Sequence, residues 1–472
     1  MSPVDWISRG VSLWRPGFEH KTPAAGALIR EPKPGASSPN LAASAAPAWP
    51  DGRSTRERLR ATLRRGQEAL SPRVLRRTLA ELQAIVDPRA SEVEGGRLAK
   101  AFAAWYRTAG AAERRDAWLL MSEHFGPDPK KINAARHHYE TAQGTPEEGG
   151  AEIRLRRALL SPRARLMQRF AAFPEGMRFL VDLRAEVLPH LKSDKRLLPL
   201  DAELETLFST WFDVAFLELR RLSWDSPASL LEKLIKYEAV HDIRSWADLK
   251  NRLDSDRRCY GFFHPKLEGE PLIFVEVALT DGISDCITPL LDETAAASDL
   301  TKATTAIFYS ISNCQAGLRG VSFGDSLIKR VVETLKEEFP KLRTFSTLSP
   351  IPGFRAWLAK QVPAPKLATW DKPLELAAKS AERQELLSWA ARYLGKELQD
   401  GKPVDPVARF HLGNGARVER LNWAGDPSPK GVKQSFGLMV NYLYDIRRLD
   451  KHRTMLSQGE IPIAGAIGDL YR

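Results

Sequence analysis

The chain has 472 residues, with 43% hydrophobic and 27% charged residues, which are ordinary values for a globular protein of two or three domains. Its apolar runs, such as "LIFVEVAL", are far shorter than the roughly 20 residues that a membrane-spanning helix needs. The net charge of +11 is compatible with nucleic acid, a membrane surface or an anionic small molecule, and does not choose among them.

Residues 1–52 are rich in Ala, Pro, Ser and Gly, as in "PKPGASSPNLAASAAPAWPDG". Such a stretch cannot bury enough apolar surface to offset its conformational entropy, so it is predicted to be a disordered tail. Residues 53–200 then carry Leu, Ala and aromatic residues at intervals of three and four, which is typical of amphipathic helices. Ser71-Pro72 and Ser161-Pro162 are typical of an N-cap followed by proline in the first turn, and the region is predicted to be an all-α bundle.

Residues 201–472 are predicted to form a second domain of α+β type. Its helical periodicity continues to about residue 254, and "PLIFVEVAL" (271–279) and "TTAIFYSIS" (304–312) are typical of buried strands. An amphipathic helix is predicted over 324–339 and a further helical insert over 375–399. Residues 409–426 are predicted to form a hairpin, with the turn at Gly413-Asn414-Gly415 and with His411 in its first strand.

Four stretches of this second domain could carry chemistry. A glycine-containing loop between a strand and a helix, "NCQAGLRGVSFGDSLIKRVV" (313–332), could bind phosphate at the helix N-terminus, although it is neither a Walker A loop nor a Rossmann fingerprint. In "FSTLSPIPGF" (345–354), two prolines stiffen the backbone around Ser349. The others are "FHLGNGA" with His411 and "GLMVNYLYD", where Tyr442 and Tyr444 share one face of an extended segment. Taken singly, each stretch is more often a purely structural feature.

Taken together and in this order, these stretches resemble the malonyl-CoA decarboxylase family. "YEAVHDIRSWADLKNRL" and "RRCYGFFHP" add to the resemblance, which covers roughly residues 200–450. It implies a helical N-terminal domain followed by a catalytic domain of the GCN5-related acetyltransferase fold. It also implies conversion of malonyl-CoA to acetyl-CoA and CO2 within malonyl-CoA and fatty acid metabolism.

The same resemblance implies the functional residues. The catalytic pair falls on Ser349 and His411, and an assisting tyrosine falls on Tyr444. Mostly through backbone N–H groups, the loop after the central strand is expected to bind CoA with the residues Arg319, Gly320, Val321, Ser322, Phe323, Gly324 and Asp325. Lys329 and Arg330 are nearby candidates for the 3′-phosphate of CoA.

The thioester is itself the electron sink for decarboxylation, so no metal, biotin, thiamine or pyridoxal cofactor is expected. His411, with an ordinary pKa near 6.5, is expected to protonate the α-carbon, while Ser349 hydrogen-bonds the malonyl group or orients His411. A nucleophilic role for Ser349 is less favoured, because no separate base and orienting group are evident.

Two other functions remain open on the sequence. The first is a CoA-dependent acyltransferase of the same fold, and the second is a basic helical protein that binds nucleic acid, suggested by "RERLRATLRR". We favour the decarboxylase, with malonyl-CoA and acetyl-CoA as ligands, a homo-oligomeric state, and no nucleic acid or membrane partner. The three cysteines are too few for a disulfide framework and form no C-x-x-C pair, which fits a reducing, intracellular compartment. The chain ends Leu-Tyr-Arg rather than in a peroxisomal Ser-Lys-Leu, and with its alanine- and arginine-rich composition a bacterial cytoplasmic location is expected.

Overall fold

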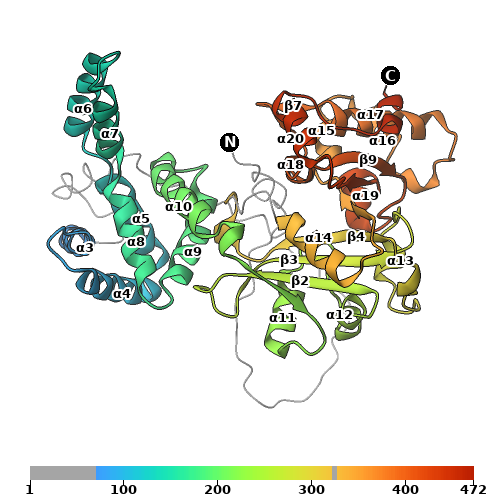
Figure 1. Ribbon diagram of the computed structural model, residues 1–472, viewed down its shortest axis with the longest axis horizontal. Helices are drawn as coiled ribbons and strands as arrows, with labels where there is room; N and C mark the ends of the chain where they lie inside the picture. Colours follow the sequence, from blue (N-terminus) through green and yellow to red (C-terminus); the bar gives the residue numbers. More distant parts are fainter. Residues whose placement is uncertain (1–70, 322–326, 472) are drawn as a thin grey trace, which may run out of the picture.

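The computed structural model describes residues 71–321 and 327–471, which form a helical bundle followed by a mixed sheet with helices on both faces (Figure 1). The predicted α+β fold class is therefore confirmed. The tail predicted over residues 1–52 and the first predicted helices lie outside the described residues. The predicted domain division at residue 200 falls within a helix, Leu198–Trp211, and stays a prediction.

The bundle consists of helices whose apolar faces pack on one another. Both predicted N-caps are present, because the Oγ of Ser71 accepts from the N–H of Val74 (3.4 Å) and the Oγ of Ser161 accepts from the N–H of Arg163 (3.0 Å). The elements in chain order are α3 (Pro72–Ile85), α4 (Glu92–Thr108), α5 (Ala111–His124), α6 (Pro129–Ala142), α7 (Glu148–Leu159), α8 (Pro162–Ala172), α9 (Gly176–Val187), η1 (Leu188–His190), η2 (Lys195–Leu197), α10 (Leu198–Trp211) and η3 (Val214–Phe216).

The first half of the sheet region builds the strands that flank the glycine-containing loop. Its elements are β1 (Glu218–Leu222), α11 (Ala228–Tyr237), α12 (Trp246–Arg252), β2 (Arg257–Phe263), β3 (Pro271–Thr280), α13 (Thr288–Leu291), η4 (Leu300–Lys302), β4 (Thr305–Asn313), η5 (Ala316–Leu318), α14 (Leu327–Glu338), β5 (Thr344–Thr347) and β6 (Ser349–Pro350). The strands predicted over 271–279 and 304–312 are confirmed as β3 and β4, and the helix predicted over 324–339 corresponds to α14 within the described residues.

The second half completes the sheet and carries the histidine. Its elements are α15 (Phe354–Leu358), α16 (Ala364–Ala368), η6 (Pro373–Glu375), α17 (Ala381–Gly395), β7 (Leu398–Gln399), β8 (Lys402–Pro403), α18 (Pro406–Gly413), β9 (Arg417–Asn422), α19 (Pro429–Ser435), β10 (Met439–Leu443), α20 (Leu449–Ser457) and α21 (Gly465–Asp469).

Two sequence predictions were wrong in this region. Residues 409–426 are not a hairpin, because Asp405 caps a helix with proline in its first turn, and His411 lies in the last turn of this helix, α18. The turn at Gly413–Gly415 leads from α18 into β9. The helical periodicity predicted to residue 254 is interrupted by β1, whose register is set by antiparallel pairing with β2.

The main sheet has the strand order β1-β2-β3-β4-β5-β10-β6, with β9 paired to β10. Among the described pairs only β4 and β5 are parallel, and their register runs from Thr305↔Thr344 to Phe308↔Thr347. After a last bond from the N–H of Leu348 to the carbonyl of Phe308 (3.0 Å), β4 continues to Asn313 while β6 pairs with β10 instead. The carboxyl-terminal parts of β4 and β5–β6 therefore separate.

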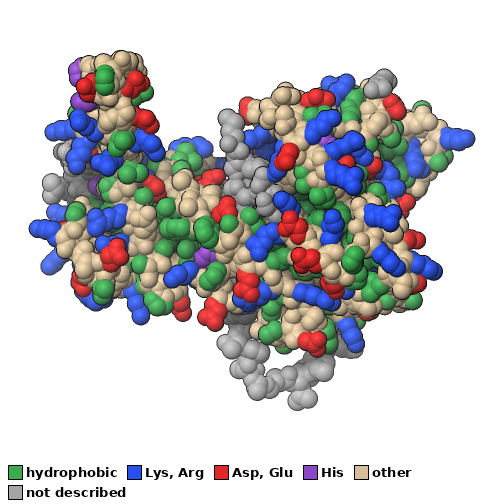
Figure 2. Space-filling view, in the orientation of Figure 1, with side chains coloured by type: hydrophobic (Ala, Val, Ile, Leu, Met, Phe, Trp, Pro, Cys, Tyr) green, Lys and Arg blue, Asp and Glu red, His purple; other side chains and the backbone are tan. Residues whose placement is uncertain are grey.

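The two faces of the sheet are covered by different helices. In Figure 1, α14 lies above β2 and β3, whereas α11 and α12 lie below them. Side chains alternate along β3, so Val275 and Val277 join the core cluster that contains α14, while Phe274 packs in the cluster of α11 and α12. On the face shown in Figure 2, Lys and Arg side chains are interspersed with acidic ones over both regions of the molecule.

Candidate active site

His411 is held by a short, well-anchored helix. The Asp405 carboxylate accepts hydrogen bonds from the N–H groups of Val407 and Ala408, both at 2.9 Å, and so fixes the first turn of α18. Phe410 and Leu412 on either side of His411 are buried in the core. The helix α18 therefore holds the buried imidazole of His411 at its carboxyl end, facing β10, the last strand along the chain.

Ser349 lies where β5 gives way to β6. Its hydroxyl donates to the Oγ1 of Thr347 at 2.9 Å, and that oxygen also accepts from the N–H of Tyr442 on β10 at 3.0 Å. Because Val440 pairs with Ser349 across the ladder, the position of the serine is set by the sheet and not by a free loop. Ser349 is 5% exposed.

A continuous chain of hydrogen bonds joins the three residues that the resemblance singled out. The Nε2 of His411 lies 3.3 Å from the Oγ of Ser349, and its Nδ1 lies 2.7 Å from the hydroxyl of Tyr444. The structure therefore brings all three together from α18, β6 and the end of β10. The sequence analysis assigned no role to Tyr442 or to Thr347. The ring of Tyr442 stacks on the imidazole of His411 with 4.7 Å between the ring centroids.

Burial keeps this chain electrically neutral. Desolvation lowers the pKa of His411 to about 3 and raises the pKa of Tyr444 well above its usual value. A neutral imidazole has one donor and one acceptor nitrogen. If Tyr444 donates to Nδ1, then Nε2–H donates to Ser349, which donates onward to Thr347. The serine hydroxyl then points away from the imidazole, which is opposite to the arrangement that activates a serine nucleophile.

The described part of the predicted CoA loop, residues 319–321, follows η5, the short turn of helix after β4. Arg319 and Gly320 are half-buried, and the Val321 side chain lies in the core. The N–H of Arg319 bonds to the carbonyl of Ala316 (3.2 Å) and that of Val321 to Leu318 (3.0 Å), so both are already used within the turn. The predicted residues Ser322, Phe323, Gly324 and Asp325 lie outside the described residues.

The two candidate contacts to the 3′-phosphate of CoA differ in their surroundings. The guanidinium of Arg330 bonds to backbone, since its Nη1 donates to the carbonyls of Val214 and Leu217 at 2.7 Å each. Arg330 therefore ties α14 to η3. Lys329 has a side chain that is 56% exposed and lines a pocket between α14 and α20 that also contains Tyr444 and Asn414.

Metal ligation finds no support in the described part of the chain. No group of three or more His, Cys, Asp or Glu side chains lies close enough together there to hold a metal ion. Within the same residues, no helix is both long and apolar enough to cross a membrane.

Comparison with known proteins assigns the chain to a family. The model of the malonyl-CoA decarboxylase C-terminal domain matches residues 215–472, and that of the N-terminal domain matches residues 125–212. The mitochondrial malonyl-CoA decarboxylase of Anser anser anser is 37% identical over 73% of this chain and 77% of its own length, and that of Rattus norvegicus is 36% identical over 71% and 77%. The chain belongs to the malonyl-CoA decarboxylase family.

Solved structures agree with this assignment. Malonyl-CoA decarboxylase from Rhodopseudomonas palustris has a TM-score of 0.75 and 41% identity, covering 84% of this chain and 99% of that one. The enzyme from Agrobacterium vitis has a TM-score of 0.76 and the same identity, covering 84% and 100%. The predicted enzyme class, a carboxy-lyase acting on malonyl-CoA, is confirmed.

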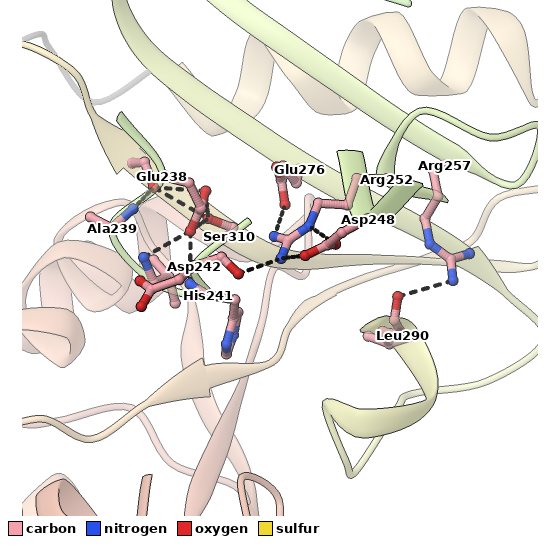
Figure 3. A network of polar contacts seen from close by, with 12 residues as sticks. Glu238, Ala239, His241, Asp242, Asp248, Arg252, Arg257, Glu276, Leu290 and Ser310 are labelled. Carbon is pink, nitrogen blue, oxygen red and sulfur yellow. Dashed lines mark hydrogen bonds and ion pairs between the residues drawn. The ribbon is translucent and has the colours of Figure 1, made fainter. Parts of the chain in front are cut away.

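The decarboxylase fold also contains a charged network that the sequence did not reveal (Figure 3). Glu276 alternates with Val275 and Val277 along β3, so the network lies on the face of the sheet that α11 and α12 cover. Tyr444, the partner of His411, lines a pocket with residues of α14 on the other face.

Arg252 is 1% exposed and pairs with Asp248 (2.8 Å) and with Glu276 (3.1 Å). Burial raises the pKa of Glu276 to about 8. Nearby, Glu238 accepts hydrogen bonds from the hydroxyls of Ser310 (2.8 Å) and Ser312 (3.1 Å).

This network fixes a connection to the central strand. The Glu238 carboxylate also accepts from the N–H of His241 (2.8 Å), and the hydroxyl of Ser312 accepts from the N–H of Ala239 (3.1 Å). The segment between α11 and α12 is thereby held against β4. The only local signal in the sequence was a cluster of charged residues in "YEAVHDIRSWADLKNRL", which is equally typical of a solvated helix.

Proposed function

We propose that Ser349, His411 and Tyr444 form the catalytic site at which this enzyme converts malonyl-CoA to acetyl-CoA and CO2. The observation that carries the proposal is the hydrogen-bond chain Tyr444–His411–Ser349, which is buried and is held by α18, β6 and β10. It stands beside the point where β4 and β5 separate. Ligands of open sheets commonly bind at the carboxyl ends of such strands.

The chemistry requires three things of the protein. Loss of CO2 leaves a carbanion next to the thioester, delocalised as an enolate, so the bond that breaks must be held out of the thioester plane. The developing oxyanion needs hydrogen-bond donors, and the α-carbon needs a proton. The electrons of the broken C–C bond go to the thioester carbonyl and return to form the new C–H bond.

A neutral hydroxyl–imidazole chain suits the last two requirements, which are hydrogen-bond donors for the oxyanion and a proton for the α-carbon. We assign His411 as the proton source and Ser349 as the donor that holds the malonyl group or passes on the proton. The low pKa of the free imidazole means that it does not hold a second proton in advance. A malonyl carboxylate brought beside it favours the imidazolium, because an opposite charge raises the pKa of histidine. Substrate binding then loads the donor.

CoA is held, in this proposal, by the loop that begins at Arg319 and lies at the start of α14. Support comes from its position after the central strand and from the exposed Lys329 beside the pocket that reaches Tyr444. The reaction needs no prosthetic group, since the substrate supplies the electron sink. We further propose a homo-oligomeric enzyme of the bacterial cytoplasm; the likeness to the enzymes of Rhodopseudomonas palustris and Agrobacterium vitis supports the bacterial part of this proposal.

The test is turnover of malonyl-CoA with no acyl acceptor present, with and without a chelator. We expect equimolar acetyl-CoA and CO2 in both cases from the wild type, and a large loss of kcat in Ser349→Ala with unchanged melting temperature. Acyl transfer to an amine without free acetyl-CoA would contradict the decarboxylase assignment. Full activity of Ser349→Ala would remove this serine from the proposed site, and loss of activity with chelator would contradict cofactor-independent chemistry.

A further inference from the structure

The helical bundle touches the predicted CoA loop directly through α9. Gly317, in the turn that opens the loop, packs so closely on α9 that an added Cβ would lie 1.8 Å from the carbonyl oxygen of Val181. Arg178 of the same helix donates to the Oε1 of Gln315 at 2.6 Å, and Gln315 in turn donates to the carbonyl of Pro271 on β3 at 2.8 Å. The loop therefore rests on a surface made by the other region of the molecule.

One buried arginine occupies the centre of this contact. Arg184 on α9 is 1% exposed, and its Nε donates to the carboxylate of Asp201 on α10 at 2.8 Å. Its Nη1 donates to two loop carbonyls, those of Gly317 and Arg319, at 2.8 Å each. A guanidinium is planar and rigid, so fixing one edge on Asp201 fixes the direction in which the other edge donates.

The bond to the Arg319 carbonyl sets the orientation of the next N–H. In a trans peptide the carbonyl and the following N–H point in opposite directions. The Arg319 carbonyl faces Arg184 in the interior, so the N–H of Gly320 faces away from the bundle. Gly320 has a φ of +83°, a conformation that glycine adopts readily.

The Gly320 N–H differs from its neighbours. The N–H groups of Leu318, Arg319 and Val321 are all bonded within the turn, whereas no described residue accepts a hydrogen bond from that of Gly320. Gly320 is half-buried and its N–H faces away from Arg184, so this donor is available to a ligand such as a phosphate of CoA.

We propose that Arg184, although it belongs to the helical bundle, is a positioning residue for CoA binding. It orients the Arg319–Gly320 peptide so that the Gly320 N–H donates to the pyrophosphate. This rests on the proposed function of the loop. Arg184 touches no part of the substrate and acts through the backbone.

The experiment compares two thioesters of malonic acid in wild type and Arg184→Met. Malonyl-CoA carries the phosphates, and malonyl-N-acetylcysteamine ends before them. We expect kcat/KM for malonyl-CoA to fall about 10-fold through KM, the effect of losing one hydrogen bond to a charged group, with kcat nearly unchanged. The kcat/KM for malonyl-N-acetylcysteamine should stay within about 2-fold of wild type. A merely structural role would lower both alike.

Arg115→Met is the matched control. Arg115 is a buried arginine of the same bundle, with its Nη2 2.7 Å from the carboxylate of Asp194, and it lies on α5 and not on the loop. It should lower the melting temperature without changing the ratio of the two kcat/KM values. Arg184→Lys keeps the charge but not the planar fork, so an intermediate ratio is expected. Gly317→Ala disturbs the same contact from the loop side and tests it if Arg184→Met does not fold.

The outcomes distinguish a failure of the positioning role of Arg184 from a failure of the proposed CoA site on which it rests. If the wild type uses both thioesters with equal kcat/KM, the loop does not bind the phosphates and the proposed CoA site is wrong. If the wild type prefers malonyl-CoA and both Arg184→Met and Gly317→Ala keep the full preference, only the positioning role is wrong. Loss of the preference in these two variants, but not in Arg115→Met, supports it.

Discussion

The two faces of the sheet use buried polar groups in different ways. On the α14 side, Ser349, His411 and Tyr444 form a neutral chain of hydroxyls and imidazole. On the other side, Arg252 forms a buried ion pair with Asp248 and also contacts Glu276, whose pKa is raised by burial (Figure 3). Paired charges hold their partners in one arrangement, whereas a neutral chain can move a proton without leaving a bare charge. We therefore expect changes on the α14 side to lower catalytic activity and changes on the other side to lower stability.

We expect the largest effect, a loss of kcat, from a change on the α14 side of the sheet, which carries the neutral chain. His411→Ala should lower kcat by about 10²- to 10⁴-fold, the usual contribution of a general acid. The measurement is release of CO2 and acetyl-CoA from malonyl-CoA, with circular dichroism melting as the control for folding. A variant that keeps near-full turnover would exclude His411 from proton transfer.

On the face that carries Arg252, changes should affect stability more than activity. Arg252→Met leaves two buried carboxyl groups without their partner and should lower the free energy of unfolding by about 3–5 kcal/mol. Urea denaturation measures this, and the kcat of the folded fraction should stay near the wild-type value. Arg77→Met removes an ion pair whose arginine side chain is 80% exposed, and it should leave the denaturation midpoint unchanged. Equal effects of the two variants would contradict the structural role of Arg252.

The neutral state of His411 can be tested by pH. Its folded-state pKa of about 3 lies below the ordinary value near 6.5, so the unfolded chain binds the extra proton first. The stability from the neutral imidazole is therefore complete above about pH 6.5 and is lost as the pH falls toward 3. We expect His411→Gln to lose less stability than wild type over this range. An inflection near pH 6.5 in wild-type kcat/KM that disappears in His411→Gln would contradict a neutral free-enzyme imidazole.

The smallest effect is expected at the strand exit. Pro350 pairs with Met439 of β10 and follows Ser349 directly. Pro350→Ala should cost only about 0.4–1 kcal/mol of stability, mainly through the unfolded chain. If the proline also fixes the serine, kcat should fall by more than the roughly 5-fold to which 1 kcal/mol corresponds. Parallel losses of activity and melting temperature would show that the proline is only structural.

Local patterns were sufficient for some parts of the fold. Ser71 and Ser161 cap helices as predicted, and the β-branched run over 304–312 became β4. The helix α18 was missed, although Asp405-Pro406 is an N-cap signal of the same kind, because the glycines at 413 and 415 were interpreted as a hairpin turn. Strand β1 was missed because its pairing with β2 overrides a helical period of apolar residues.

The candidate site shows a different limit. No periodicity or spacing joins Ser349 to His411, which are 62 residues apart, and only the family resemblance put the two residues and Tyr444 together. Thr347 and Tyr442 complete the surroundings of the imidazole through strand register, which is a tertiary property. The low pKa of His411 was also out of reach, because burial and not residue type lowers it.

The close approach of Gly317 to Val181 has a consequence for how such proteins can be recombined. A chimera that joins the sheet region of one family member to the bundle of another must match the α9 backbone to the loop turn within a fraction of an ångström, since there is no space even for a methyl group. The helical bundle and the sheet region therefore have to be exchanged together. Exchange points inside the α9–η5 contact should fail, and those that move α9 together with the loop should succeed.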